Sequence, residues 1–235
     1  MTVYLIHGLL ESSLGQFAPQ IRRWQGRGTI VPLQLPGHAE NTLDAGSDLI
    51  GDSVRLLAAA VERYGPGHVI AASYLGSPVA LRYALEPDTQ ASSLVLMGLV
   101  PEVPEEIFSR WVQGFYVLAD ENPSLADAYE RTHGPRWRST LDAFAGVVER
   151  AYEEEIAVSW PMLEGSRIPV LVANGSHKSN ERGAARRADE AGGMLSGHVF
   201  EGAGHVPSRD RPEAFAVTVE SFWRSGNPRG LEHDA

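Results

Sequence analysis

The stretch HVIAASYLGSPVALRYA (residues 68–84) decides the fold, because it joins a strand to a helix through a turn that carries a serine. Residues 68–72 are apolar and β-branched, as expected of a buried strand, and residues 79–85 show helical spacing. Such a turn lifts the hydroxyl of Ser73 above the sheet and puts the backbone N–H of Tyr74 at a helix start. Ala71 and Gly76 are small enough for a tight turn, whereas Leu75 is larger than a tight turn usually admits.

Similar apolar runs recur along the chain and alternate with amphipathic stretches. Further strands are expected at residues 3–6, 29–33, 94–97, 170–173 and 198–200, and further helices at 49–64 and 215–223. Strands that alternate with helices imply right-handed crossovers and a mostly parallel sheet. The sequence therefore predicts an α/β fold with helices on both faces of the sheet.

This alternation stops between residues 101 and 167, where only helix-like segments occur, at 105–119, 125–131 and 140–159. Residues 101–165 hold 13 Asp and Glu against 5 Arg, a net charge of −8. We interpret residues 101–167 as a helical lid inserted into a core made of residues 1–100 and 168–225. Such a lid is expected over the carboxyl ends of the strands, where ligands bind in α/β sheets. Residues 226–235 are expected to form a loose tail.

Composition excludes several classes of function. The net charge of −10 argues against a nucleic-acid partner, and the absence of cysteine excludes disulfides and a thiol nucleophile. No run approaches the roughly 20 apolar residues of a membrane span. The first residues also lack the basic and apolar regions of a secretion signal. We therefore expect a cytoplasmic protein with a small-molecule substrate.

Three further motifs accompany the serine turn: HGLL (residues 7–10), LPGH (35–38) and GAGHVP (202–207). Together the four motifs resemble the α/β-hydrolase superfamily, and especially its small lidded esterases, thioesterases and C–C hydrolases. The resemblance extends from residue 3 to about residue 223. It implies that Ser73 is the nucleophile and His205 the general base. It also implies that the amides of Leu9 and Tyr74 bind an oxyanion.

The remaining histidines are not expected to be catalytic. In the family that the chain resembles, a histidine at the position of His7 is structural, and His38 is interpreted as a turn residue. The eight histidines stand on separate loops without close pairing to carboxylates, which argues against a metal site. We expect neither a metal nor a cofactor.

The acid of a Ser-His-acid triad is missing from its usual place. The family has Gly-x-x-Asp after the strand at 170–173, whereas this chain has GSHK, with Lys178 in the acid's place. A cation there opposes the imidazolium that a carboxylate would stabilise. Three carboxylates remain as alternatives: Glu102 after the strand at 94–97, Glu181 three residues beyond the lysine, and Glu11. A Ser-His pair without an acid is a further alternative.

The lid aromatics bear on the substrate. Trp111, Phe115 and Tyr116 are spaced to line a pocket, which favours an apolar or aromatic acyl group. The first hypothesis is therefore a serine hydrolase that cleaves an ester, thioester or lactone. A cyclase, a lyase or a C–C bond-cleaving enzyme on the same fold is the alternative that Lys178 and Leu75 favour. A non-catalytic binding protein is the third.

Overall fold

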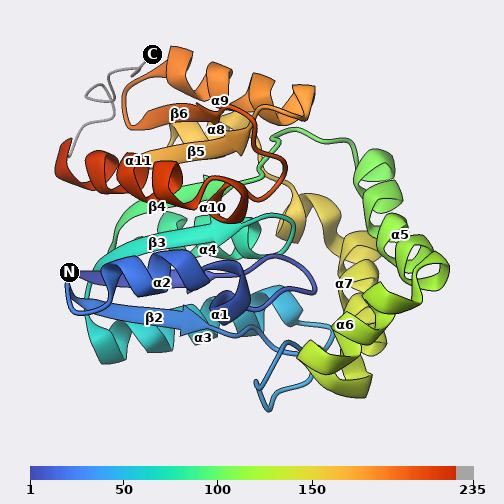
Figure 1. The fold of residues 1–235 in the computed structure, drawn as a ribbon. Helices are drawn as coiled ribbons and strands as arrows, with labels where there is room; N and C mark the ends of the chain where they lie inside the picture. Colours follow the sequence, from blue (N-terminus) through green and yellow to red (C-terminus); the bar gives the residue numbers. More distant parts are fainter. Residues whose placement is uncertain (226–235) are drawn as a thin grey trace.

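The computed structural model describes residues 1–225, so the predicted tail at 226–235 lies outside the described residues. Six strands form one sheet in the order β2-β1-β3-β4-β5-β6, and every neighbouring pair is parallel (Figure 1). The predicted α/β class is confirmed. The strands are β1 (Thr2–Ile6), β2 (Thr29–Leu33), β3 (Gly67–Ala72), β4 (Ala91–Met97), β5 (Val170–Gly175) and β6 (Leu195–Phe200).

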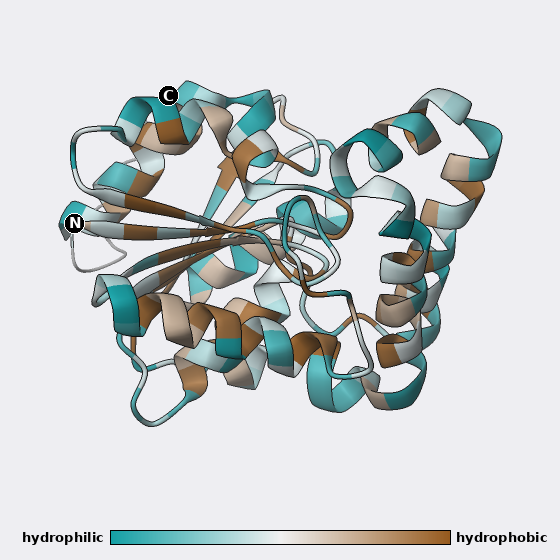
Figure 2. Ribbon diagram, turned by 90° about the horizontal axis from the view of Figure 1, so that it is seen from below, coloured by the Kyte–Doolittle hydropathy of each residue, from teal (hydrophilic) through white to brown (hydrophobic). Residues whose placement is uncertain are grey.

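Helices cover both faces of the sheet, which is why its strands are apolar on both sides (Figure 2). Tyr4 and Ile6 of β1 join the core under one layer of helices, and Val3 and Leu5 join the core under the other. The first layer contains α3 (Leu49–Tyr64), α4 (Gly76–Leu85) and α9 (Ser179–Ala191). The opposite layer contains α2 (Ala18–Trp24) and α11 (Pro212–Ser225), with the short α1 (Ser13–Gln16) and α10 (Pro207–Asp210) beside them.

Residues 101–167 contain helices and no strand, as predicted. They comprise α5 (Glu105–Glu121), α6 (Pro123–His133), the 3-10 turn η1 (Gly134–Arg136), α7 (Trp137–Ala151), the π-helical turn η2 (Tyr152–Ile156) and α8 (Trp160–Glu164). The single helix predicted at 140–159 is wrong. Its pattern is broken by the π turn, and a new helix starts at Trp160 with Ser159 as its cap and Pro161 in its first turn.

This helical segment stands beside the carboxyl ends of the strands (Figure 1). Several of its side chains, among them Thr140, His133 and Arg136, bind the loop that follows β2. Thr140 donates a hydrogen bond to the Gly37 carbonyl at 2.9 Å, and the His133 ring accepts one from the Ala39 amide at 3.0 Å. These contacts fix the helical segment over the edge of the sheet at which all six strands end. Within residues 1–225, no helix has both the length and the apolar character needed to cross a membrane.

Candidate active site

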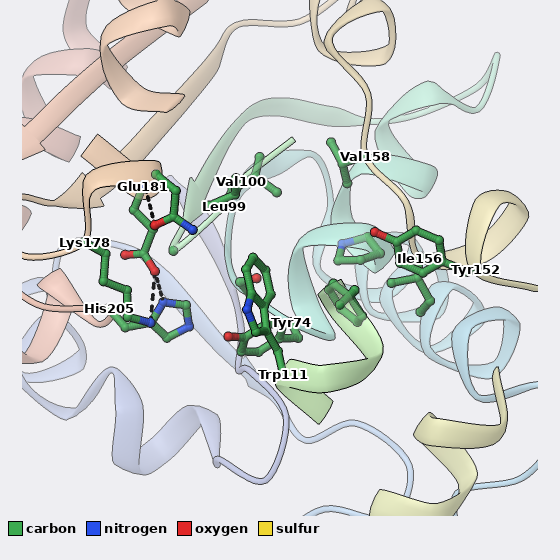
Figure 3. A pocket seen from close by; sticks show the side chains of 15 residues that line it. Tyr74, Leu99, Val100, Trp111, Tyr152, Ile156, Val158, Lys178, Glu181 and His205 are labelled. Atoms are coloured by element: carbon green, nitrogen blue, oxygen red, sulfur yellow. Dashed lines mark hydrogen bonds and ion pairs between the residues drawn. The ribbon is translucent and has the colours of Figure 1, made fainter. Parts of the chain in front are cut away.

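A cavity of about 190 Å³ lies between the strand ends and the helical segment (Figure 3). Ser73 and His205, which are 132 positions apart in the sequence, both line it. Its polar lining residues lie on the loops after β3, β5 and β6 and in the first turn of α9, and most of its apolar ones lie in or beside the helical segment. The lining residues are Ser73, Tyr74, Pro78, Gly98, Leu99, Val100, Phe108, Trp111, Tyr152, Ile156, Val158, Lys178, Asn180, Glu181 and His205.

Ser73 lies in the short turn between β3 and α4, as the sequence predicts. Its amide donates to the Met97 carbonyl at 2.9 Å, so the backbone is still held by the neighbouring strand when the turn begins. Two glycines let the loop after β1 approach this turn. A Cβ on Gly8 would overlap the Ser73 carbonyl oxygen, and one on Gly76 would lie 2.6 Å from the His7 carbonyl oxygen. The small residues are therefore needed for close backbone packing.

Leu9 and Tyr74 directly follow Gly8 and Ser73, the two residues at this contact; Tyr74 lines the cavity, whereas Leu9 is not among its lining residues. Residues 8–11 form a turn that is closed by a 3.3 Å hydrogen bond from the Glu11 amide to the Gly8 carbonyl. Leu10 takes a positive φ of 53° in it and donates its amide to the His38 ring at 3.2 Å. Among the residues that the structure describes, the Leu9 and Tyr74 amides have no protein acceptor. Neither donor is therefore engaged within the described part of the protein.

His7 and His38 are buried structural residues. The His7 ring accepts the Leu35 amide at 3.0 Å, and the two rings pack with their centroids 4.7 Å apart. Burial lowers the pKa of His7 to about 4 and lowers that of His38 well below its usual value. Each ring is therefore neutral near pH 7 and can accept a backbone amide, which holds the loops after β1 and β2 in place.

His205 is paired with a carboxylate. Its Nδ1 lies 2.6 Å from Oε1 of Glu181, whose side chain is only 3% exposed, whereas the His205 side chain is 25% exposed (Figure 3). No hydrogen bond joins the Ser73 hydroxyl to His205 among the described residues, a contact that is often long before substrate binds. With Nδ1 donating to Glu181, the Nε2 atom of His205 is left free to accept a proton.

The first turn of α9 brings Glu181 to this position. Glu181 lies on the buried face of that helix with Ala184, Ala185 and Ala188, at the i, i+3, i+4 and i+7 spacing of one helix side. Asn174, at the end of β5, donates to the Glu181 carbonyl at 2.8 Å and also binds both backbone groups of Leu99. The carboxylate therefore comes from a helix that is tied to two strand ends and not from a mobile loop.

Two opposing effects act on the pKa of Glu181. Burial raises it, but the hydrogen bonds and charges of His205 and Lys178 outweigh burial and leave the pKa below its usual value. Lys178 Nζ lies 3.2 Å from the same Oε1 atom. Tyr74, whose ring centroid is 5.5 Å from that of His205, has its pKa raised to about 12 by burial and by the charge of Glu181. Its phenol is therefore neutral at working pH.

The other two candidate acids lie elsewhere. Glu102 has a side chain that is 52% exposed and faces Arg187 at 4.0 Å, and its amide donates to the Val158 carbonyl at 2.8 Å. Glu11 pairs with Arg209 at 3.2 Å. Of the three candidate carboxylates, only Glu181 makes a hydrogen bond to His205 among residues 1–225.

The apolar side of the cavity differs from the sequence-based expectation. Trp111 lines it, but Phe115 and Tyr116 do not: the Phe115 ring makes a T-shaped contact with Tyr74, and the Tyr116 hydroxyl donates to the exposed Asp142 at 2.7 Å. Phe108, one turn before Trp111, takes part instead. The i, i+3 spacing of these two aromatics was the signal available in the sequence.

Tyr152 and Ile156 are also lining residues that the sequence analysis missed, because they stand at the two ends of an unpredicted π turn. Figure 3 places them with Val158 across the cavity from His205, and Tyr74 and Trp111 lie between. Among residues 1–225, no group of three or more His, Asp or Glu side chains is arranged to hold a metal ion.

Comparison with known proteins identifies the family. A family model described as the alpha/beta hydrolase family matches residues 3–218. The chain belongs to the alpha/beta hydrolase family. It is similar to NosK from Streptomyces actuosus, with 48% identity, a TM-score of 0.92, and coverage of 96% of this chain and 98% of that one. A search of curated protein sequences finds no match.

More distant alpha/beta hydrolase structures share the fold. MenH from S. aureus is 15% identical with a TM-score of 0.71, covering 96% of this chain and 94% of that one. A thermophilic esterase from Thermogutta terrifontis is 18% identical with a TM-score of 0.70, covering 97% and 90%. Because these identities are low, the two comparisons bear on the fold alone.

Proposed function

We propose that this alpha/beta hydrolase is a serine-dependent enzyme that cleaves an ester, thioester or lactone whose acyl part is small and largely apolar. The observation that carries the proposal is the 2.6 Å hydrogen bond between His205 and the buried Glu181, in a cavity that Ser73 also lines. A serine hydroxyl becomes a useful nucleophile only when a neighbouring base takes its proton, and a carboxylate orients that base.

In the proposed mechanism the Ser73 oxygen attacks the acyl carbon while His205 Nε2 takes the hydroxyl proton. Glu181 stabilises the resulting imidazolium through Nδ1–H. The amides of Leu9 and Tyr74 donate to the oxyanion of the tetrahedral intermediate, which is usually a large contribution to catalysis. His205 then gives its proton to the leaving group, and an acyl-Ser73 ester remains. Water attacks that ester with His205 again as base, which releases the acid and restores the serine.

The cavity suggests the size of the acyl part. Its volume of about 190 Å³ is close to the roughly 150 Å³ that holds one benzene molecule, and below the roughly 300–1,000 Å³ of most drug-sized ligand sites. A single ring or a short chain therefore fits inside, with the leaving group directed outward. Phe108, Trp111 and Tyr152 present ring surfaces to it, which favours an aromatic acyl group. In this proposal residues 101–167 act as a lid that keeps water from the acyl site.

The test is turnover of p-nitrophenyl esters. Wild type is expected to hydrolyse p-nitrophenyl benzoate faster than a long-chain ester, and Ser73→Ala is expected to lower that rate by at least about 10³-fold. Ser92→Ala, at an exposed position of β4, is the matched control and should keep full activity.

The same assay separates the other hypotheses. Turnover that survives Ser73→Ala would indicate chemistry in which the serine is not the nucleophile, as in a lyase or cyclase. No turnover by wild type, together with no loss of biological activity in Ser73→Ala, would indicate a binding protein.

A further inference from the structure

Two different donors meet at one carboxylate oxygen in the cavity. Glu181 Oε1 accepts the hydrogen bond from His205 Nδ1 at 2.6 Å and lies 3.2 Å from Lys178 Nζ (Figure 3). The Glu181 side chain is 3% exposed, whereas that of Lys178 is 48% exposed and reaches the carboxylate from the solvent side. Lys178 is the only lysine in the chain.

The two donors do not carry the same charge when the enzyme is ready to react. His205 has to be neutral to take a proton from Ser73, so its Nδ1–H gives Glu181 a hydrogen bond but no positive charge. Among residues 1–225, Lys178 and His205 are the only basic side chains within ion-pair distance of Glu181. The permanent charge that faces this buried carboxylate therefore comes from Lys178.

We propose that Lys178 is a positioning residue that acts through Glu181: its ammonium group keeps the buried carboxylate ionised and holds Oε1 against His205. The inference rests on the proposed function. The proposed role explains how a cation can lie three residues before Glu181 without preventing that carboxylate from stabilising the His205 imidazolium. Compared with the position of the acid in the family, which Lys178 occupies here, the carboxylate lies three residues later, in the first turn of α9. Lys178 is then its counter-ion.

Among residues 1–225, no other ionisable group near the Glu181–His205 pair brings a positive charge within ion-pair distance of Glu181. Tyr74 faces His205 from the β3–α4 turn and is neutral. Asp210 accepts the Gly204 amide beside His205 at 2.8 Å, and His177 Nδ1 lies 3.9 Å from the position that a Cβ on Gly204 would take. Arg182 donates to the Ser176 carbonyl at 2.9 Å.

The effect of removing the Lys178 charge follows from two opposing contributions to the ionisation of Glu181. Burial favours the neutral acid, and the nearby positive charge favours the carboxylate. An opposite charge at this distance typically shifts a titration by about 1–3 pH units, and the half-exposed Lys178 belongs at the low end. Without it, the Glu181–His205 pair is expected to take up an inactivating proton about one pH unit higher.

The first experiment measures the rate at which a fluorophosphonate labels wild type, Lys178→Met and Lys178→Arg as a function of pH. In Lys178→Met the acidic side of the pH–rate profile, on which protonation slows labelling, should move up by about one pH unit. At any pH on that side, labelling should therefore be roughly tenfold slower than in wild type. Lys178→Arg should keep that side within a few tenths of a unit. A purely structural lysine would scale the whole profile without moving it, and an unmoved acidic side in Lys178→Met overturns the proposal.

The second experiment does not depend on activity. Unfolding by urea is measured for wild type, Lys178→Gln, Glu181→Gln and the double variant at pH 7. Lys178→Gln should lower the urea midpoint in the wild-type background and leave it unchanged in the Glu181→Gln background. Equal changes of the urea midpoint in both backgrounds would show that Lys178 and Glu181 do not interact, which overturns the proposal. If no variant is labelled but the coupling is present, the proposed hydrolase function fails and the role of Lys178 as counter-ion stands.

Discussion

Gly98→Ala tests how closely the loop after β4 confines His205. Gly98 has a φ of +67°, and a Cβ built on it would lie 2.6 Å from Cε1 and 2.9 Å from Nδ1 of the His205 ring. Carbon atoms in ordinary contact are about 3.5 Å apart or more, so the ring has to move by about 1 Å. Nδ1 is the atom that donates to Glu181, so the same movement disturbs that hydrogen bond.

A misplacement of about 1 Å in a catalytic group can lower a rate by roughly 10²-fold, which is about 2.7 kcal/mol of activation free energy. We expect that loss in kcat/KM for Gly98→Ala, together with about 1 kcal/mol of stability lost to the positive φ. Gly193→Ala is the matched control, because Gly193 has a φ of +69° and nothing within 4 Å of its Cβ position. Both variants are assayed for ester hydrolysis and for urea unfolding. A folded Gly98→Ala enzyme with activity within threefold of Gly193→Ala would show that the loop after β4 does not confine the His205 ring.

Two further predictions concern charge. Glu181→Gln should lower kcat/KM by about 10³- to 10⁴-fold, because an amide cannot stabilise the imidazolium, whereas Glu102→Gln should stay within twofold; the reverse order would assign the acid to Glu102. The second prediction concerns His7, whose pKa is about 4 in the fold and 6.5 in the unfolded chain. Unfolding therefore takes up a proton between these values, so the contribution of His7 to stability is complete above pH 6.5 and lost progressively toward pH 4. The contribution of His7 alone should make the free energy of unfolding about 2 kcal/mol lower at pH 5 than at pH 7.5, and equal urea midpoints at the two pH values would contradict this.

Much of the fold could be predicted because buried parallel strands and amphipathic helices leave strong patterns. The helix at 49–64 has the predicted bounds, since its apolar side chains repeat at helical spacing. Strand starts were less clear where polar or small residues enter the sheet. β6 starts at Leu195 and not at residue 198, because Ser196 and Gly197 interrupt the apolar run. A Cβ at Gly197 would overlap the Ala185 carbonyl of α9, so the packing of that helix requires the glycine there.

The serine turn and the histidine loop could be predicted because their chemistry depends on short local motifs. The partner of His205 could not, because it depends on where α9 begins. A helix that starts at Ser179 turns Glu181 inward with three alanines, whereas the sequence left Glu181 as one of three candidate carboxylates. The Glu-x-x-Ala-Ala-x-x-Ala pattern at 181–188 contained this information.

The cavity wall depends on a departure from regular helix. The expected helix at 140–159 contains a π turn at Tyr152–Ile156, and its two end residues line the cavity. A π turn is set by tertiary packing and leaves no clear periodicity in one sequence. The lining role of Phe108 could have been predicted from the sequence, since Phe108 precedes Trp111 by three positions on the same helix.

In the proposed mechanism the Ser73 oxygen is a nucleophile that His205 activates. The most direct test of this mechanism is peptide mapping by mass spectrometry after treatment with a fluorophosphonate. We expect one adduct per chain, carried by Ser73, and labelling that is at least about 10²-fold slower in His205→Ala. An unmodified Ser73 in folded wild type, or an adduct on a different side chain, would contradict it.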